Sequence, residues 1–566
     1  MTPTSTTRDD THDTLPAPGM TSSPHFTKTQ RNRLAWLPLL FLLAGLAHVL
    51  AHAVLSFPQS RLLFTPVSDN FDITSTGFSL CDFSQFKNAT DPEFTQLRFY
   101  CSPIDRNLLP ASATSQWLTS SEEPYLLVVG YPISKGNNLG VIQLDDQGLE
   151  RHRRVAHKNT SMEWNLVPLG DTGERFRVEA TVFSSGYGFS EPFHLDLGLG
   201  DQASGLLHAL STLVFAFTML FLPGFALRAL LQAKKSYHLP TALIPVPGVL
   251  LLAALGLGLW AGGWPSTPCR VTVTTLVAAV LLGMGVVFRR WRPETLTTPL
   301  ERRALAVCLL LALLGVGKSL YAPGPQGDLY PDRISRTMET GDRSDSRISY
   351  HVAQVALNGL SPRDDKAKAL FDPWSFFSRG PVSGLAAATV IGLSGGAPDT
   401  ALPNEIWRPY DAKGFQVYRI AMIVMATTAF FAFFGLVGGV LEEKWGYLAL
   451  LVAAGTPFLA HEVYFTWPKL QACLFLFASA WLLLQRRPLA AGLLLGVGYL
   501  THPLVLLSVP ALVGIVALRK ATASPQTRFA WCRLQSIRNV EYLLIGLGAI
   551  FLFWQLCGYG ESGQAR

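Results

Sequence analysis

The chain has 566 residues, of which 49% are hydrophobic and only 15% are charged, and its formal net charge is +7. Soluble proteins carry about a quarter charged residues, so this deficit favours a protein of the lipid bilayer over a soluble one. The basic residues are scattered between apolar runs, a pattern that orients membrane segments, and nucleic acid is therefore not an expected partner.

The N-terminal part begins with a polar tail and a first apolar run. Residues 1–33 are rich in Thr, Ser, Pro and Asp, which predicts a disordered cytoplasmic tail. The run 34–55 is long enough to cross a bilayer, which takes about 20 residues. Its Ala-His-Ala triplet at 51–53 resembles a signal-peptidase site, which leaves cleavage as an alternative. We favour an uncleaved transmembrane anchor, because a secretory signal seldom follows so long a tail.

The segment 56–203 has no apolar run of membrane length and predicts a β-rich, sandwich-like domain. Hydrophobic and polar residues alternate at 175–182, as they do in a half-buried strand. The runs 125–131 and 139–144 also indicate strands, because Pro, Gly and Asn turns separate them. Nothing in this domain indicates catalysis.

The seven cysteines show no metal-ligand spacing. Cys81 and Cys101 share the polar segment. A disulfide between them is compatible with a location outside the cytoplasm, although the sequence does not decide the pairing.

The rest of the chain predicts two groups of membrane helices, at 204–320 and 414–566, around a polar loop at 321–413. With the first run, the apolar runs predict about eleven spans of membrane length. They lie at 205–231, 241–263, 271–289, 303–320, 415–441, 446–464, 468–485, 488–501, 503–518 and 541–557. The basic residues between them fall on one side, which places the N-terminus inside and the β-rich domain and the loop outside.

The 321–413 loop is too long for a simple connection, and loops of such length are usually functional or disordered. Its run 348–356 repeats apolar residues at helical spacing, which predicts an amphipathic helix. Asp345 is placed as the N-cap of this helix, and Gly359 and Pro362 as its end.

Carboxylates beside this helix indicate a chemistry at the water–lipid boundary. Asp345, with Asp342 in reserve, is placed to act as general base on an acceptor hydroxyl. Interleaved arginines can hold a lipid phosphate while it leaves. The carboxylates lack a diagnostic ligand spacing, so no cofactor is predicted and a divalent metal is left open. For any single residue of this mixed-charge loop, a solvated surface position is the commoner alternative.

Further along the loop, the apolar stretch 381–395 predicts a short helix lying on or dipping into the bilayer.

Several stretches resemble a known family. They are the Asp-bearing loop with its Tyr/His helix ending in Gly-Leu-Ser-Pro, Ser-Arg-Gly-Pro-Val at 378–382, Phe-Thr-Trp-Pro-Lys-Leu at 465–470, and Gly-Leu-Leu-Leu-Gly-Val-Gly-Tyr-Leu-Thr-His at 492–502. Over roughly 300–520 the chain resembles the polytopic GT-C glycosyltransferases, in particular a less characterised bacterial branch. It departs from them at Ser346 and Ser378, where many members carry an acidic residue.

The resemblance implies a polytopic α-helical membrane protein with a GT-C-like core. It implies that a polyprenyl-phosphate-linked sugar is the donor and that Asp345 accepts a proton. Lys469, with Arg347 or Arg379, would stabilise the departing phosphate.

Three further residues are candidates to line the cavity of this site: Tyr350, His351 and His502. Each candidate also has a simpler interpretation. Lys469 can snorkel to the interface, His502 can be merely packed, and His351 can face either Asp345 or water.

The leading hypothesis is a hexosyl- or pentosyltransferase of the bacterial inner membrane, acting on its outer face. Its partners would be membrane lipid, a polyprenyl-phosphate-linked sugar, and a hydroxyl of a cell-envelope glycan or lipid as acceptor. One alternative is a flippase or transporter of a lipid-linked glycan, for which inverted repeats or ionisable residues at mid-bilayer would be typical. The other is a catalytically inactive glycan-binding membrane protein.

Overall fold

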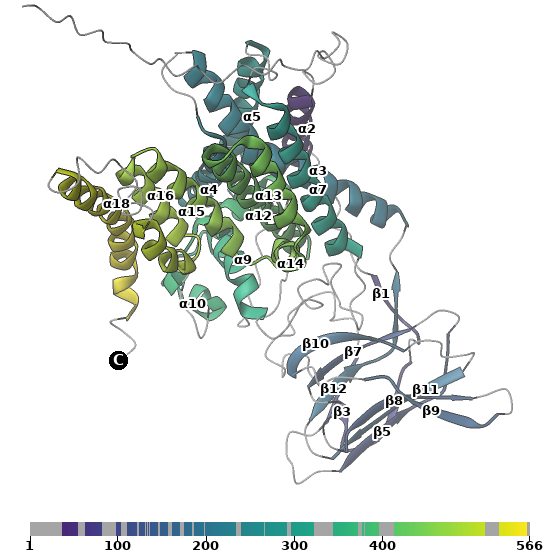
Figure 1. Ribbon diagram of the computed structural model, residues 1–566. Coiled ribbons are helices and arrows are strands. Elements are labelled where there is room, and N and C mark those ends of the chain that lie inside the picture. Colours follow the sequence, from purple (N-terminus) through teal and green to yellow (C-terminus); the bar gives the residue numbers. More distant parts are fainter. Residues whose placement is uncertain are drawn as a thin grey trace, which may run out of the picture.

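The structure is a computed structural model that divides into a helical part and a separate body of strands (Figure 1). It describes residues 37–54, most of 63–196, and the stretches 199–233, 239–264, 266–290, 296–321, 343–371, 376–378, 380–395, 412–514 and 531–562. The tail predicted at 1–33 lies outside these residues.

The body of strands consists of two antiparallel sheets. The seven-stranded sheet contains β1 (Leu63–Pro66), β3 (Ser79–Leu80), β4 (Phe99–Cys101), β7 (Tyr125–Gly130), β10 (Ser161–Pro168), β12 (Tyr187–Ser190) and β13 (Phe193–Asp196). The six-stranded sheet contains β2 (Ile73–Thr76), β5 (Ala111–Ser115), β6 (Leu118–Thr119), β8 (Asn138–Leu144), β9 (Glu150–Arg154) and β11 (Arg175–Val182).

The two sheets share one hydrophobic core. Leu126 and Val128 of β7 contribute from one sheet, and Phe176, Val178 and Ala180 of β11 contribute from the other. Buried and more accessible residues alternate strictly along β11, which confirms the strand predicted there from the period of two. The strands predicted at 125–131 and 139–144 are present as β7 and β8.

A disulfide joins Cys81 to Cys101, whose Cα atoms are 5.6 Å apart. Cys101 ends β4, and Cys81 directly follows β3, its partner in the seven-stranded sheet. The bond therefore links neighbouring chain segments at the edge of this sheet.

The helical part contains helices of very different lengths. They are α2 (Leu37–Val54), α3 (Leu199–Ala233), η3 (Thr241–Leu243), α4 (Pro245–Ala261), α5 (Thr267–Arg290), α7 (Pro299–Tyr321), α9 (Arg343–Leu357), α10 (Asp365–Phe371), η4 (Phe376–Ser378), α11 (Val382–Leu393), α12 (Ala412–Val440), α13 (Glu443–Gly455), α14 (Pro457–Tyr464), α15 (Lys469–Leu484), α16 (Pro488–Tyr499), η5 (Pro503–Ser508) and α18 (Trp531–Ser562).

The prediction of about eleven spans is wrong for the described residues. Five helices are long and apolar enough to cross a membrane: α3, α4 with η3, α5, α12 and α18. The count reaches six if α13 and α14 form one span, although a bend of 73° separates them. These helices indicate a multi-pass membrane protein.

Several predicted spans are shorter helices, and prolines set where these helices begin. Proline has no backbone N–H and begins helices far more readily than it continues them. Pro457 and Pro488 are the first residues of α14 and α16, and Pro468 immediately precedes α15. Helix α7 has the length of a span, but Glu301, Arg302 and Arg303 lie in its first turns.

Helices α4 and α5 join two opposite ends of the helical part. The chain just before α4 contacts Arg228, which donates to the Leu239 carbonyl at 2.9 Å. At the other end of α4, Trp260 donates from Nε1 to the carbonyl of Leu360, just after α9, at 2.8 Å. Helix α5 then returns and ends at Arg289 and Arg290. Helix α9 and these arginines therefore lie at opposite ends.

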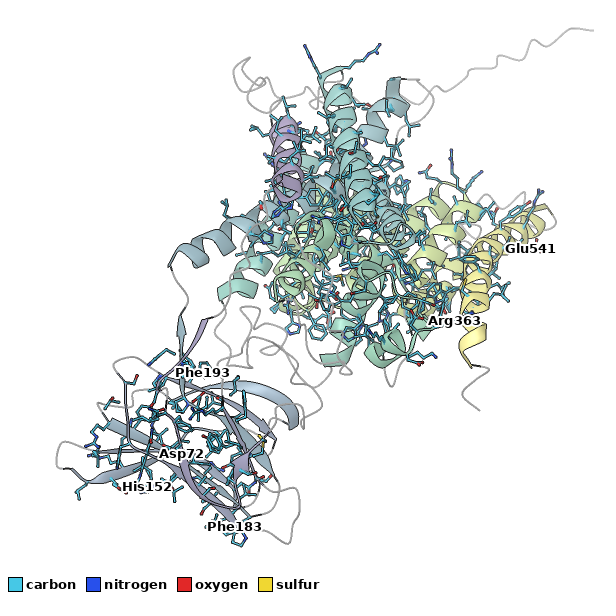
Figure 2. All side chains as sticks on the ribbon, turned by 180° about the vertical axis from the view of Figure 1, so that it is seen from behind. Asp72, His152, Phe183, Phe193, Arg363 and Glu541 are labelled. Atoms are coloured by element: carbon cyan, nitrogen blue, oxygen red, sulfur yellow. A yellow bond between two sulfur atoms is a disulfide. The ribbon has the colours of Figure 1, made fainter. Side chains whose placement is uncertain are left out.

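The end that carries α9 is also the end nearest the sheets. Helices α9, α10 and α14 lie on this side in Figure 1. Figure 2 shows Arg363, between α9 and α10, at the same level of the helical part. The β-rich body and the 343–371 segment thus share one end of the molecule.

A buried ion pair fixes the opposite end. Arg228 of α3 lies 2.8 Å and 3.0 Å from the two carboxylate oxygens of Glu301, and the side chains are 1% and 2% exposed. Glu301 also accepts from the Thr298 backbone N–H, and Thr298 Oγ1 accepts from the Glu301 N–H, which is a capping box at the start of α7. Thr241 of η3 completes the group through its hydroxyl. Three elements are thereby held together by one carboxylate.

Candidate active site

Helix α9 begins at Arg343, so Asp345 lies in its first turn. The prediction that Asp345 is the N-cap is therefore wrong. The predicted end is correct: Gly359 has a φ of 63°, its N–H donates to Ala356, and the Leu360 N–H donates to Val355. These two bonds form a Schellman motif, which favours glycine at the position with positive φ.

The second half of α9 is buried on every face, which corrects the amphipathic helix predicted from the sequence. Val352, Val355 and Ala356 are buried as expected, but so are the polar residues Ser349 and Gln354. Helix α9 packs against α11 on one side and α4 on another. It is an internal element of the helical part and not a surface helix.

Tyr350 and His351 lie within this packing and do not face water. The Tyr350 ring is 5.3 Å from that of Tyr418 in α12, and the His351 ring meets the edge of Phe371 in α10 at 5.9 Å. Both side chains are 2% exposed. They connect α9 with two neighbouring helices.

Helix α11 is also internal, so the helix predicted on or in the bilayer at 381–395 is covered by protein. All of its residues are buried. A Cβ atom on Gly256 of α4 would lie 2.0 Å from the Leu385 carbonyl oxygen, and one on Gly384 would lie 2.5 Å from Val352 of α9. Glycine at these positions lets α4 and α9 approach α11 more closely than alanine would.

Two of the stretches that carry the family resemblance meet just before α11. A Cβ atom on Gly380 would lie 1.6 Å from the carbonyl oxygen of Leu500, and the Val382 N–H donates to the same oxygen at 3.2 Å. The chain at Gly380 therefore packs directly against the backbone that leads to His502.

Replacing Gly380 by alanine is expected to separate these segments or to strain them. Overpacking of this kind costs about 1–3 kcal/mol. We expect a matching loss of stability when unfolding in detergent is followed by tryptophan fluorescence. Gly283→Ala in α5 is the control, because a Cβ atom there has nothing within 4 Å. Equal stability of the two variants would contradict the close contact.

The third stretch joins them through an aromatic contact. The Lys469 ammonium lies over the Trp467 ring, 3.4 Å from its centroid, and the Trp467 ring is 5.9 Å from that of His502. His502 is 8% exposed and accepts from the Leu504 N–H through Nδ1 at 3.1 Å. Lys469 is also the first residue of α15, where the free N–H groups of a helix add positive potential.

A path of contacts connects this group with α9. Tyr350 touches Tyr418, the Tyr418 hydroxyl lies 3.5 Å from the Thr466 carbonyl oxygen, and Thr466 precedes Trp467. Lys469, His502, Tyr350 and Gly380 thus belong to one connected group of contacts. This region is the candidate active site.

Arg419 is a residue that the sequence analysis missed. It follows Tyr418 in α12, is 1% exposed, and donates from Nη2 to the Tyr464 carbonyl at 3.1 Å. A charged residue inside an apolar span is rare and is often functional, and that signal was present in the run 415–441. Its position adds a fixed positive charge near the candidate active site.

Other predicted site residues cannot be placed in this region. Asp342 and Arg379 lie outside the described residues, and for Asp345 and Arg347 the structure describes the backbone of α9 and not the side chains. Within the described ranges, no group of three or more His, Cys, Asp or Glu residues could hold a metal ion.

No protein-family model, no curated protein and no solved structure matches this chain.

Proposed function

We propose that this chain is a membrane glycosyltransferase that transfers a sugar from a polyprenyl phosphate to an acceptor hydroxyl on the outer face of a bacterial inner membrane. One observation carries the proposal. Lys469, His502 and the chain at Gly380 come together at the end of the helical part that carries α9. The segments that hold Gly380 and Lys469 lie far apart in the sequence, and next to them the Ser383 hydroxyl donates to Gln471 across 88 positions.

The chemistry requires a base for the acceptor and a positive site for the leaving phosphate. Asp345 would take the proton of the acceptor hydroxyl as its oxygen attacks the anomeric carbon. The bond from that carbon to the phosphate oxygen breaks, and Lys469 would stabilise the charge that remains on the polyprenyl phosphate. Direct attack of this kind inverts the anomeric centre.

The surroundings of Lys469 suit this role. Lys469 is half-buried and its ammonium group lies over the Trp467 ring, so little side-chain freedom is left to lose on binding. The start of α15 adds backbone N–H groups that favour an anion at the same place. Arg419 contributes a second positive charge close to Tyr464.

A transfer assay tests this role. Reconstituted protein is supplied with polyprenyl phosphates carrying labelled hexoses and pentoses, and transfer to envelope glycans or lipids is measured. Lys469→Met is expected to remove a charge-assisted contact worth about 1.5–3 kcal/mol. This corresponds to a loss of roughly 10- to 100-fold in kcat/KM, with most of the loss in the KM for the donor if the contact also forms in the ground state.

Lys444→Met is the matched control. Lys444 also lies beside a tryptophan, Trp445, but it belongs to α13. Helix α13 starts at the end of the molecule that holds Arg228, since the Thr298 hydroxyl there donates to Glu443. The control should transfer at the unaltered rate. Equal activity of the Lys469→Met and Lys444→Met variants would refute the role given to Lys469.

A further inference from the structure

A cavity lies away from the candidate active site. It has a volume of about 520 Å³ and opens between α2, α3, α5 and α7. This volume falls within the usual range of ligand pockets, roughly 300–1,000 Å³. Leu296, whose carbonyl accepts from Arg228, lines it, so the cavity is at the end opposite α9.

The wall of the cavity is apolar over most of its length. Phe41 of α2 and Phe217 of α3 pack at 6.0 Å between ring centroids, and Phe217 and Phe221 pack at 4.5 Å. Leu305 and Leu309 continue the wall along α7. Residues four apart on a helix lie on one face, so α7 offers a continuous apolar stripe. An aliphatic chain fits such a surface.

Two arginines interrupt this apolar wall at one end. Arg302 and Arg303 in the first turns of α7 both line the cavity. Arg302 donates to the carbonyl and the hydroxyl of Thr297, and Arg303 is exposed. The neighbouring Glu301 is fully engaged by Arg228 and by the capping box, so its carboxylate does not neutralise them. Within the described part of the chain, neither arginine makes an ion pair.

We propose that this cavity binds one anionic glycerophospholipid of the cytoplasmic leaflet, with its phosphate on Arg302 and Arg303 and an acyl chain along Phe217, Phe221 and Leu309. Guanidinium groups bind phosphate oxygens in a bidentate way, and basic pockets between membrane helices are typical sites for acidic head groups. The site does not depend on sugar transfer. A lipid bound in this cavity would contact α2, α3 and α7 together.

Native mass spectrometry of the full chain in detergent tests this site. Phosphatidylglycerol and phosphatidylcholine are added in equal amounts, and we expect one bound phosphatidylglycerol with at least a tenfold preference. The double variant Arg302→Gln with Arg303→Gln should lose this preference. Ala306→Phe, which fills the cavity from an exposed position of α7, should reduce the binding of both lipids.

The control removes the same charge from the same end of the molecule. Arg289→Gln with Arg290→Gln changes two exposed arginines at the end of α5 that do not line the cavity, and it should keep the preference. The proposal is overturned if the unaltered protein shows no preference. It is also overturned if the Arg302/Arg303 variant keeps the preference, or if the Arg289/Arg290 variant loses it equally.

Discussion

Replacing Arg228 by methionine is expected to destabilise the protein by about 3–5 kcal/mol, because it leaves the carboxylate of Glu301 buried without its counter-ion. Both side chains are almost wholly buried, and Arg228 also donates to the carbonyls of Leu239 and Leu296. The loss would therefore loosen α3, η3 and α7 together. Thermal unfolding in detergent, followed by tryptophan fluorescence, measures it.

A double variant separates the charge effect from the helix cap. Glu301→Gln keeps a side chain that can accept from the Thr298 N–H, as glutamine does in a capping box. Combined with Arg228→Met it leaves no unpaired charge, so the double variant should be more stable than the sum of the single losses predicts. Arg289→Met, at an exposed position, should change stability by less than about 0.5 kcal/mol. An Arg228→Met variant as stable as this control would contradict the interpretation.

Replacing Asp345 by asparagine is expected to reduce sugar transfer by about 10²- to 10⁴-fold, the usual contribution of a general base. The substitution keeps the size of the side chain and its place in the first turn of α9. Binding of the donor should remain, since the phosphate contacts proposed for Lys469 are unchanged. Initial rates at saturating donor separate kcat from KM.

The control for Asp345→Asn is Asp365→Asn. Asp365 is the first residue of α10 and its side chain is fully exposed, with Lys368 3.3 Å away. It should transfer sugar at the unaltered rate. A flippase or a glycan-binding protein would keep its activity in both variants, so an Asp345→Asn protein that still works normally would favour those alternatives.

Local patterns in the sequence predicted local structure well. The alternation at 175–182 identifies β11, and Gly359 identifies the end of α9. In both cases the physical cause lies within a few residues: a side chain alternates between two faces of a sheet, or a glycine adopts a positive φ. Structure that depends only on neighbouring residues can therefore be predicted from the sequence alone.

The errors arose where the cause lies far along the chain. An apolar run has the same appearance whether it crosses a bilayer or packs as a short helix between others. The sequence therefore predicts spans at α15 and α16, which are too short for that, and a helix at the bilayer at α11, which protein covers. The apolar spacing over 348–356 predicts one exposed face on α9, but neighbouring helices cover that face, and Gln354 is buried there.

The candidate active site was predictable only in part. The sequence predicts Lys469 and His502 as site residues, yet nothing in their spacing indicates that the Trp467 ring contacts both of them. The contact of Gly380 with Leu500 and the pairing of Arg228 with Glu301 depend on tertiary packing across many residues. Sequence periodicity carries no information about such pairs.

The proposed chemistry requires that α9 and α10 lie on the outer side of the membrane, together with the sheets. Cysteine accessibility measures this directly: Asp365→Cys in α10 and Lys444→Cys in α13 are each treated with a membrane-impermeant maleimide in right-side-out and inside-out vesicles, with the parent protein as background. Both positions are exposed. We predict that Asp365→Cys reacts in right-side-out vesicles and Lys444→Cys in inside-out vesicles. The reverse result would place the candidate active site in the cytoplasm and contradict sugar transfer on the outer face.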